Sequence, residues 1–118
     1  MAAFEHPEYD APVRELLHPQ VVWHVAGDNP LAGSFTGVDA VHAAMHRYGE
    51  HSGGTLRLTP LSTFVDDSHA VLIRDATADR DGVDYHAHEV DVFHIADGRI
   101  TAMWSFSEDQ EATDRLWS

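Results

Sequence analysis

The chain has 118 residues and no cysteine, and its 7 Lys and Arg against 20 Asp and Glu give a formal net charge of −13. This charge repels phosphate backbones and anionic bilayers, so we expect neither nucleic acid nor a membrane as a partner. The lack of cysteine excludes disulfides and thiolate chemistry. The length fits one domain over residues 1–118, and no segment approaches the ~20 apolar residues of a membrane span or carries a signal-peptide pattern, so we expect a cytoplasmic protein.

The first third of the chain predicts a helix, a strand and a loop. Residues Asp10–Pro19 have the signals of a short helix, because Asp10 can cap its first turn and Pro19 prevents its continuation. Residues Gln20–Ala26 are rich in β-branched and aromatic side chains, which favours a strand. The Gly-rich and Pro-containing segment Gly27–Gly37 predicts a loop.

The middle of the chain predicts a helix followed by two strands. Apolar residues recur at helical spacing in Val38–Glu50, and Gly53 and Gly54 end this pattern. Thr55–Val65 alternates between apolar and polar residues and contains Pro60, which is typical of a bulge or an edge strand. Ala70–Ala78 reads as the next strand.

The segment Asp84–Phe106 predicts two long strands joined by the tight turn at residues 96–99, and Glu108–Trp117 predicts a short closing helix. Strands that follow helices and are joined by hairpin turns indicate an α+β fold with one mainly antiparallel sheet packed against helices.

Two carboxylates share one face of the first long strand. Strand side chains alternate, so Glu89 and Asp91 point to the same side as Tyr85 and Phe93. An ionised carboxylate among apolar groups is costly unless it has a partner or takes up a proton. Asp91 is therefore either satisfied by a salt bridge or hydrogen bond, or tuned for chemistry.

Several segments resemble the SnoaL-like branch of the nuclear transport factor 2 and ketosteroid isomerase superfamily. The resemblance rests on LLHP, VVWHVAG, DNPLAGSFTGVDAV, VDVFHIADGRI, TAMWSFSED and DRLW, which together span about Asp10 to Trp117. It implies a strongly bent sheet wrapped into a cone, with helices closing an apolar pocket. It also implies a homodimer that pairs through the outer face of the sheet. The fold hosts several activities, so the resemblance alone selects none of them.

The resemblance implies two catalytic positions. The general base of the isomerases corresponds to His24, and their protonated carboxylic acid corresponds to Asp91; in the isomerases themselves an apolar site keeps such an acid neutral. Only nine residues precede Asp10, so we expect most of the first helix of the isomerases, which carries another oxyanion donor, to be absent. This departure argues against steroid isomerisation.

Both positions carry ionisable side chains, so the resemblance implies a cofactor-independent isomerase or polyketide-cyclase-like enzyme. His24 and Asp91 would act by acid–base chemistry on an apolar, carbonyl-bearing or polycyclic metabolite. The alternatives are a non-catalytic binding or association domain, and a hydrolase or dehydratase using the same pocket. His24 is equally compatible with a purely structural role in its strand. The aromatic residues are equally compatible with packing in the core and no role in binding. The expected substrate-binding residues are Tyr85, Phe93, Met103, Tyr48, Phe35, Glu89 and Trp104.

A metal site is the competing chemistry. His86 and His88 are spaced for two ligands on one strand face, but they lack a third ligand and face away from Asp91. His42 and His46 form a helical pair with the same deficiency. We therefore expect a pocket without a metal or cofactor.

Overall fold

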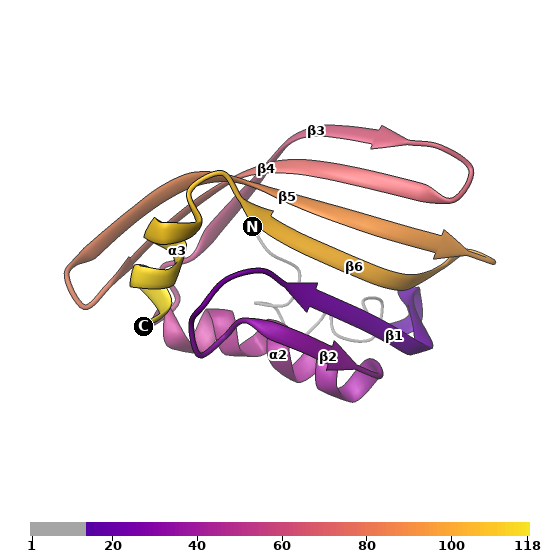
Figure 1. Cartoon of the computed structure of the whole chain (residues 1–118), viewed down its shortest axis with the longest axis horizontal. Helices are drawn as coiled ribbons and strands as arrows, with labels where there is room; N and C mark the ends of the chain where they lie inside the picture. Colours follow the sequence, from indigo (N-terminus) through magenta and orange to yellow (C-terminus); the bar gives the residue numbers. More distant parts are fainter. Residues whose placement is uncertain (1–13) are drawn as a thin grey trace.

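The structure is a computed structural model that describes residues 14–118. One sheet runs through the whole molecule, with helices against one of its faces (Figure 1). In chain order the elements are β1 (Leu17–Val25), β2 (Gly33–Thr36), α2 (Val38–His51), β3 (Arg57–Val65), β4 (His69–Arg80), β5 (Val83–Ala96), β6 (Arg99–Ser107) and α3 (Gln110–Trp117).

The six strands lie in the order β2-β1-β6-β5-β4-β3. β1 and β6 are parallel, and every other neighbouring pair is antiparallel. The sheet curves strongly but does not close, so β2 and β3 remain as its two edges (Figure 1). The expected α+β class with a mainly antiparallel sheet is confirmed.

Two-residue turns set the register of the long hairpins. Asp81 and Gly82 have φ angles of 51° and 80°, and Asp97 and Gly98 have φ angles of 52° and 74°. Positive φ at both central residues gives the turn a twist that matches the twist of the strands it joins, and Asp-Gly pairs favour this conformation. The second of these turns confirms the one predicted at residues 96–99.

Both helices cover the same face of the sheet. Val41 and Ala44 of α2 pack in a cluster with Trp23 and Met103. Leu116 and its neighbour Trp117 in α3 pack against small and aromatic residues of β4 and β5, including Ala76 and Tyr85. Asp109 caps α3, because its carboxylate accepts a hydrogen bond from the Ala112 amide at 3.1 Å. We call the helix-covered side of the sheet the inner face.

The structure corrects two predicted boundaries. The loop expected over Gly27–Gly37 contains the short strand β2. Its Gly residue has a low strand propensity and its Ser favours turns, so the sequence does not predict this strand. β1 begins at Leu17, so the predicted helix does not reach Pro19; the beginning of that helix lies outside the described residues. In the part of the chain from residue 14 onward, neither helix is long and apolar enough to cross a bilayer.

Candidate functional site

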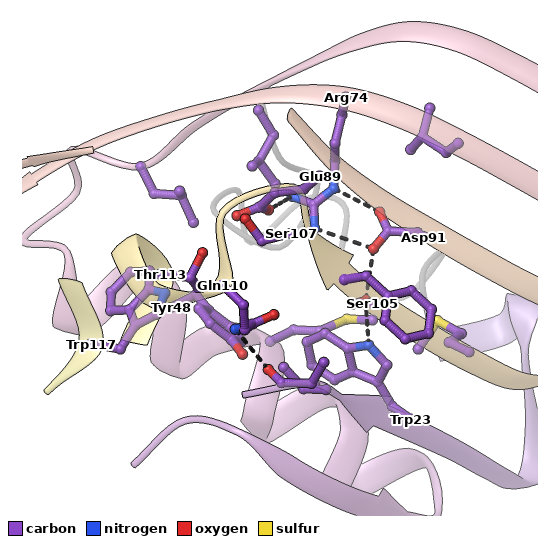
Figure 2. A pocket seen from close by; sticks show the side chains of 18 of the residues that line it. Trp23, Tyr48, Arg74, Glu89, Asp91, Ser105, Ser107, Gln110, Thr113 and Trp117 are labelled. Atoms are coloured by element: carbon purple, nitrogen blue, oxygen red, sulfur yellow. Dashed lines mark hydrogen bonds and ion pairs between the residues drawn. The ribbon is translucent and has the colours of Figure 1, made fainter. Parts of the chain in front are cut away.

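A cavity of about 350 Å³ lies between the inner face of the sheet and the helices (Figure 2). Its walls are mostly apolar, with one polar cluster on the sheet side. The residues that line it include Trp23, Asn29, Tyr48, Arg74, Glu89, Asp91, Phe93, Met103, Ser105, Gln110 and Trp117.

Strand register places the polar cluster on the inner face. Asp91 of β5 lies between Leu72 of β4 and Ser105 of β6, and directly opposite partners share a face. One step along the strands, Glu89 is opposite Arg74. The alternation of side chains along β5 therefore brings both carboxylates into the cavity, as the sequence predicts.

Arg74 is the cation that both carboxylates share. Its Nε and Nη2 donate to Asp91 at 2.7 and 3.2 Å, while Nη1 lies 2.9 Å from Glu89 Oε1. All three side chains are 13–14% exposed. Burial lowers the pKa of Arg74, but the charges of Asp91 and Glu89 outweigh this effect, so the pKa stands above its ordinary value. The guanidinium therefore remains charged inside the cavity wall.

A chain of hydrogen bonds holds Asp91 from the side opposite Arg74. Ser105 Oγ donates to Asp91 Oδ1 at 2.7 Å and accepts from Trp23 Nε1 at 2.8 Å (Figure 2). Charge-assisted hydrogen bonds of this kind are stronger than neutral ones and fix the direction of the carboxylate. The structural alternative for Asp91, a salt-bridged and hydrogen-bonded carboxylate, is thus what the geometry shows.

Glu89 differs from Asp91 in its electrostatics. Burial raises the pKa of Glu89, although the Arg74 charge and the hydrogen bond from Tyr85 oppose the shift. Tyr85 Oη donates to Glu89 Oε2 at 2.7 Å and contacts the hydroxyls of Ser107 and Thr113 at 3.1 and 2.9 Å. Burial, with the adjacent Glu89 charge, raises the pKa of Tyr85 to about 12, so Tyr85 stays a neutral phenol. One guanidinium therefore serves two carboxyls, and burial makes Glu89 easier to protonate than an exposed glutamate.

We expect Glu89→Gln to change how stability depends on pH. The raised pKa of Glu89 means that proton binding stabilises the folded state; this contribution is complete below the unfolded-state pKa and is lost as pH rises through the folded-state pKa. The variant cannot titrate there, so the melting temperature of the wild type minus that of the variant falls as pH rises above about 4.3. Thermal melts across pH test this. The exposed Glu111→Gln is the control; a difference for Glu89→Gln that is flat with pH, or that rises, contradicts the expectation.

Aromatic rings form the wall opposite the carboxylates. The Tyr48 ring lies 5.9 Å from Trp23 and 5.2 Å from Trp117, measured between centroids. Burial raises the pKa of Tyr48, so its hydroxyl, which donates to the Leu31 carbonyl at 3.3 Å, stays protonated. This wall presents ring faces and edges to the cavity, as Figure 2 shows.

The loop after β1 is fastened to α3 at one end of the cavity. Asp114 Oδ1 accepts hydrogen bonds from the Asp28 amide at 2.9 Å and from Asn29 Nδ2 at 2.8 Å. Gln110 Nε2 lies 3.3 Å from the same oxygen and from the Ala26 carbonyl. A Cβ at Gly27 would come within 2.6 Å of Asp114 Oδ1, so this close approach requires glycine. These contacts place the amides of Asn29 and Gln110 in the cavity lining.

The expectation that His24 faces the cavity with Asp91 is wrong. Trp23 and Val25 of β1 line the cavity, so the side chain between them points to the opposite face of the sheet. The His24 ring lies 2.9 Å from Ser34 Oγ and stacks on Trp104 with a centroid distance of 5.2 Å. The geometry therefore keeps the His24 imidazole away from Asp91.

The predicted binding residues divide into two groups. Phe93, Met103, Tyr48 and Glu89 line the cavity. Tyr85 lies in the core behind it, Phe35 packs 6.0 Å from the Trp23 ring, and Trp104 lies on the outer face, where the His94 ring is 4.6 Å away. These last three do not line the cavity: Trp104 points to the other face by strand alternation, Phe35 packs against Trp23, and Tyr85, although on the inner face, is buried in the core with Leu116 and Trp117 of α3.

Sequence reasoning missed Arg74, Ser105 and Trp23. Arg74 is the one cation in the predicted strand Ala70–Ala78 and has the same parity as Leu72 and Ala76, so the sequence indicates its inward direction. Its pairing with two carboxylates depends on the register between β4 and β5, which the sequence does not specify by itself.

The histidine pairs do not gather into a metal site. His86 Nε2 lies 2.6 Å from Asp75 Oδ1, and His88 lies 3.7 Å from Asp75 and from Glu108, all on the surface. His42 and His46 lie side by side on α2 with ring centroids 4.5 Å apart. Among residues 14–118 no group of three or more His, Cys, Asp or Glu side chains is arranged to hold a metal ion.

Comparison with known proteins places this chain in a family. The chain matches the SnoaL-like domain over residues 1–103. It is 29% identical over 109 residues to an uncharacterized protein of Mycobacterium tuberculosis, a match that covers 92% of this chain and 83% of that protein. Solved structures with NTF2-like and cystatin-like folds are among its structural neighbours.

Two solved structures illustrate the similarity. Bal32a, from a soil-derived mobile gene cassette, is 28% identical with a TM-score of 0.90, and the match covers 98% of this chain and 88% of Bal32a. A putative SnoaL-like polyketide cyclase from Jannaschia sp. CCS1 is 16% identical with a TM-score of 0.79, over 98% of this chain and 83% of that one. With a family match over most of its length, the chain belongs to the SnoaL-like domain family.

Proposed function

We propose that the protein is an enzyme that moves a proton next to a carbonyl group of an apolar metabolite, without a cofactor, giving isomerisation or cyclisation. The observation that carries the proposal is the apolar cavity with Asp91 and Arg74 in its wall, side by side at 2.7 Å. In this proposal Asp91 accepts the proton and Arg74 binds the carbonyl oxygen, while Glu89 shares Arg74 with Asp91.

Charge conservation at Arg74 favours this chemistry. When the Asp91 carboxylate takes a proton from the carbon next to the carbonyl, the C–H electron pair forms a C=C bond, and the π pair of the C=O bond moves onto the oxygen as an enolate charge. The anion thus moves from Asp91 to the substrate oxygen while both remain beside one guanidinium, so no new charge is created in the cavity. Within the described residues, Arg74 uses three of its five N–H groups on carboxylates. In this proposal the other two donate to the carbonyl oxygen of the substrate.

The walls indicate the shape of the substrate. Trp23, Tyr48 and Trp117 supply ring surfaces on one side, and Phe93 and Met103 supply apolar surface near Asp91. A cavity of about 350 Å³ is at the lower end of the range for small-molecule sites. A compact ketone with a conjugated or aromatic ring fits these dimensions and chemistry. The similarity in fold to a putative polyketide cyclase supports the same class of substrate.

Ligand binding is the first test. Trp23 and Trp117 line the cavity, so a bound compound should change their fluorescence. We expect saturable fluorescence changes with ring-bearing ketones, and weaker binding by matched hydrocarbons of the same size that lack the oxygen. Equal binding of ketone and hydrocarbon would contradict a role for Arg74 in holding the oxygen.

A second candidate function is non-catalytic binding of the same compounds. It is favoured by the engagement of both Asp91 oxygens, one by Arg74 Nε and the other by Arg74 Nη2 and Ser105. Such a carboxylate can act as a fixed polar anchor rather than as a base. Binding without any exchange of the hydrogens next to the carbonyl distinguishes this candidate from the enzyme.

A further inference from the structure

Gln110, at the start of α3, is a polar side chain of the cavity that has no part in the proposed chemistry. Its Nε2 donates to the carbonyl oxygen of Ala26, the residue that follows β1. Val25 at the end of β1 and Asp91 of β5 both pair with Ser105 of β6. Two strand spacings, about 10 Å, therefore separate Asp91 from the strand end at which the Gln110 amide is bound.

The neighbours of Gln110 fix which end of its amide faces the cavity. Nε2 lies 3.3 Å from both the Ala26 carbonyl oxygen and Asp114 Oδ1. A carbonyl and a carboxylate only accept hydrogen bonds, so the nitrogen of the amide must point to them. Burial raises the pKa of Asp114, but hydrogen bonds from Asn29, Asp28 and Gln110 outweigh this effect and lower it, so the carboxyl stays ionised. Gln110 Oε1 is left on the side of the cavity (Figure 2).

The Gln110 oxygen is an acceptor without a donor in the protein. Within residues 14–118 no group donates a hydrogen bond to Oε1. The other polar side chains at this end are already paired: Asn29 Oδ1 accepts from a backbone amide of its own loop at 2.9 Å. The hydroxyls of Ser107 and Thr113 contact Tyr85 Oη. An apolar ligand at this end would remove solvent from Oε1 and leave it unpaired, which opposes binding, whereas a ligand with a hydroxyl would satisfy it.

We propose that Gln110 Oε1 accepts a hydrogen bond from a hydroxyl group of the substrate, so that the substrate is a ring-bearing ketone with a hydroxyl at the end away from its carbonyl. The position of the carbonyl in this inference rests on the proposed function, which puts it at Arg74. The Arg74 guanidinium only donates and Gln110 Oε1 only accepts, and they reach the cavity from β4 and α3 (Figure 2). The cavity therefore distinguishes the two ends of a ligand. One aromatic ring with an oxygen at each end, and a hydrogen bond of about 2.9 Å beyond each oxygen, spans the distance between them.

Calorimetric titration with para-hydroxyacetophenone, para-methylacetophenone and para-methoxyacetophenone tests the proposal. At about pH 6, well below the pKa of a phenol, we expect the wild type to bind the hydroxyl compound about three- to tenfold more tightly than the methyl compound. This ratio is the usual contribution of one neutral hydrogen bond. The methoxy compound should bind no better than the methyl compound, because its oxygen cannot donate.

Gln110→Met identifies the acceptor. Methionine keeps the length of the side chain but has no amide, so the ratio of the hydroxyl to the methyl affinity should fall to about one. A general change in the cavity affects both compounds and cancels in this ratio. The other glutamine of the chain, Gln20, is exposed on β1, and Gln20→Met is the matched control that should keep the wild-type ratio. Thermal melts check that both variants fold.

A fourth compound, para-ethylphenol, separates this inference from the proposed function, because it carries the hydroxyl but no carbonyl. Wild type that binds it as tightly as para-hydroxyacetophenone would contradict the role of Arg74 and leave the Gln110 contact in place. Equal binding of the hydroxyl and methyl ketones by the wild type, no binding of the hydroxyl ketone, or a preference for it that survives in Gln110→Met would overturn the inference. A ketone preference that persists in that case leaves the proposed function standing.

Discussion

Replacing Arg74 with methionine should lower the free energy of unfolding at neutral pH by about 3–5 kcal/mol, because it leaves Asp91 and Glu89 buried without their cation. Methionine keeps most of the length of the side chain, so the loss reports the charge rather than a cavity. The two carboxylates would then repel each other and lose three charge-assisted contacts. Urea unfolding at neutral pH measures the change.

Acidification and a second substitution separate charge from packing in this experiment. The loss in Arg74→Met should shrink as pH falls, because protonated carboxyls no longer need the guanidinium. Arg74→Met/Asp91→Leu should recover part of the loss, since removing both partners costs less than removing one. Arg115→Met removes an exposed cation 3.5 Å from Glu111 and should cost less than about 0.5 kcal/mol. A loss below about 1 kcal/mol for Arg74→Met would show that Asp91 and Glu89 do not depend on the Arg74 charge.

The alternation of side chains along the strands predicts part of the site, namely the shared face of its two carboxylates. Alternation along β5 placed Glu89 and Asp91 on one face among apolar residues, and the structure confirms this. The sequence also predicts the Asp-Gly turns and the apolar stripe of α2, because each depends on a local pattern of residues. These features need no knowledge of which strands pair.

The rest of the site depends on long-range register. Arg74 reaches the carboxylates because β4 pairs with β5 over its whole length, and Ser105 reaches Asp91 because β6 pairs with the other edge of β5. The predicted inward direction of His24 came from the family position and not from the pattern of β1. Val21, Trp23 and Val25 alternate with it along the strand and point to the inner face, so His24 points to the outer face. The alternation of side chains along β1 therefore predicts the direction of His24 better than the family position does.

Asp91→Asn should reduce turnover by about 10²–10⁴-fold, which is the usual contribution of a positioned acid or base. Asparagine keeps the shape of the side chain but cannot accept the proton, and Arg74 still pairs with Glu89 at 2.9 Å, so the fold and the cavity should persist. Ligand affinity measured by tryptophan fluorescence should change only a few-fold. His24→Gln should leave turnover at the wild-type level, because His24 lies on the opposite face of the sheet.

Exchange of substrate hydrogen for deuterium measures proton abstraction by Asp91 directly. A ketone selected by the fluorescence titration is incubated in deuterium oxide with wild type, Asp91→Asn or His24→Gln, and NMR follows loss of the signal next to the carbonyl. If Asp91 is the base, the signal is lost rapidly with wild type and His24→Gln, and at a rate near that of buffer with Asp91→Asn. Exchange by Asp91→Asn at the wild-type rate, or none by the wild type with any ketone that binds, would contradict this role of Asp91.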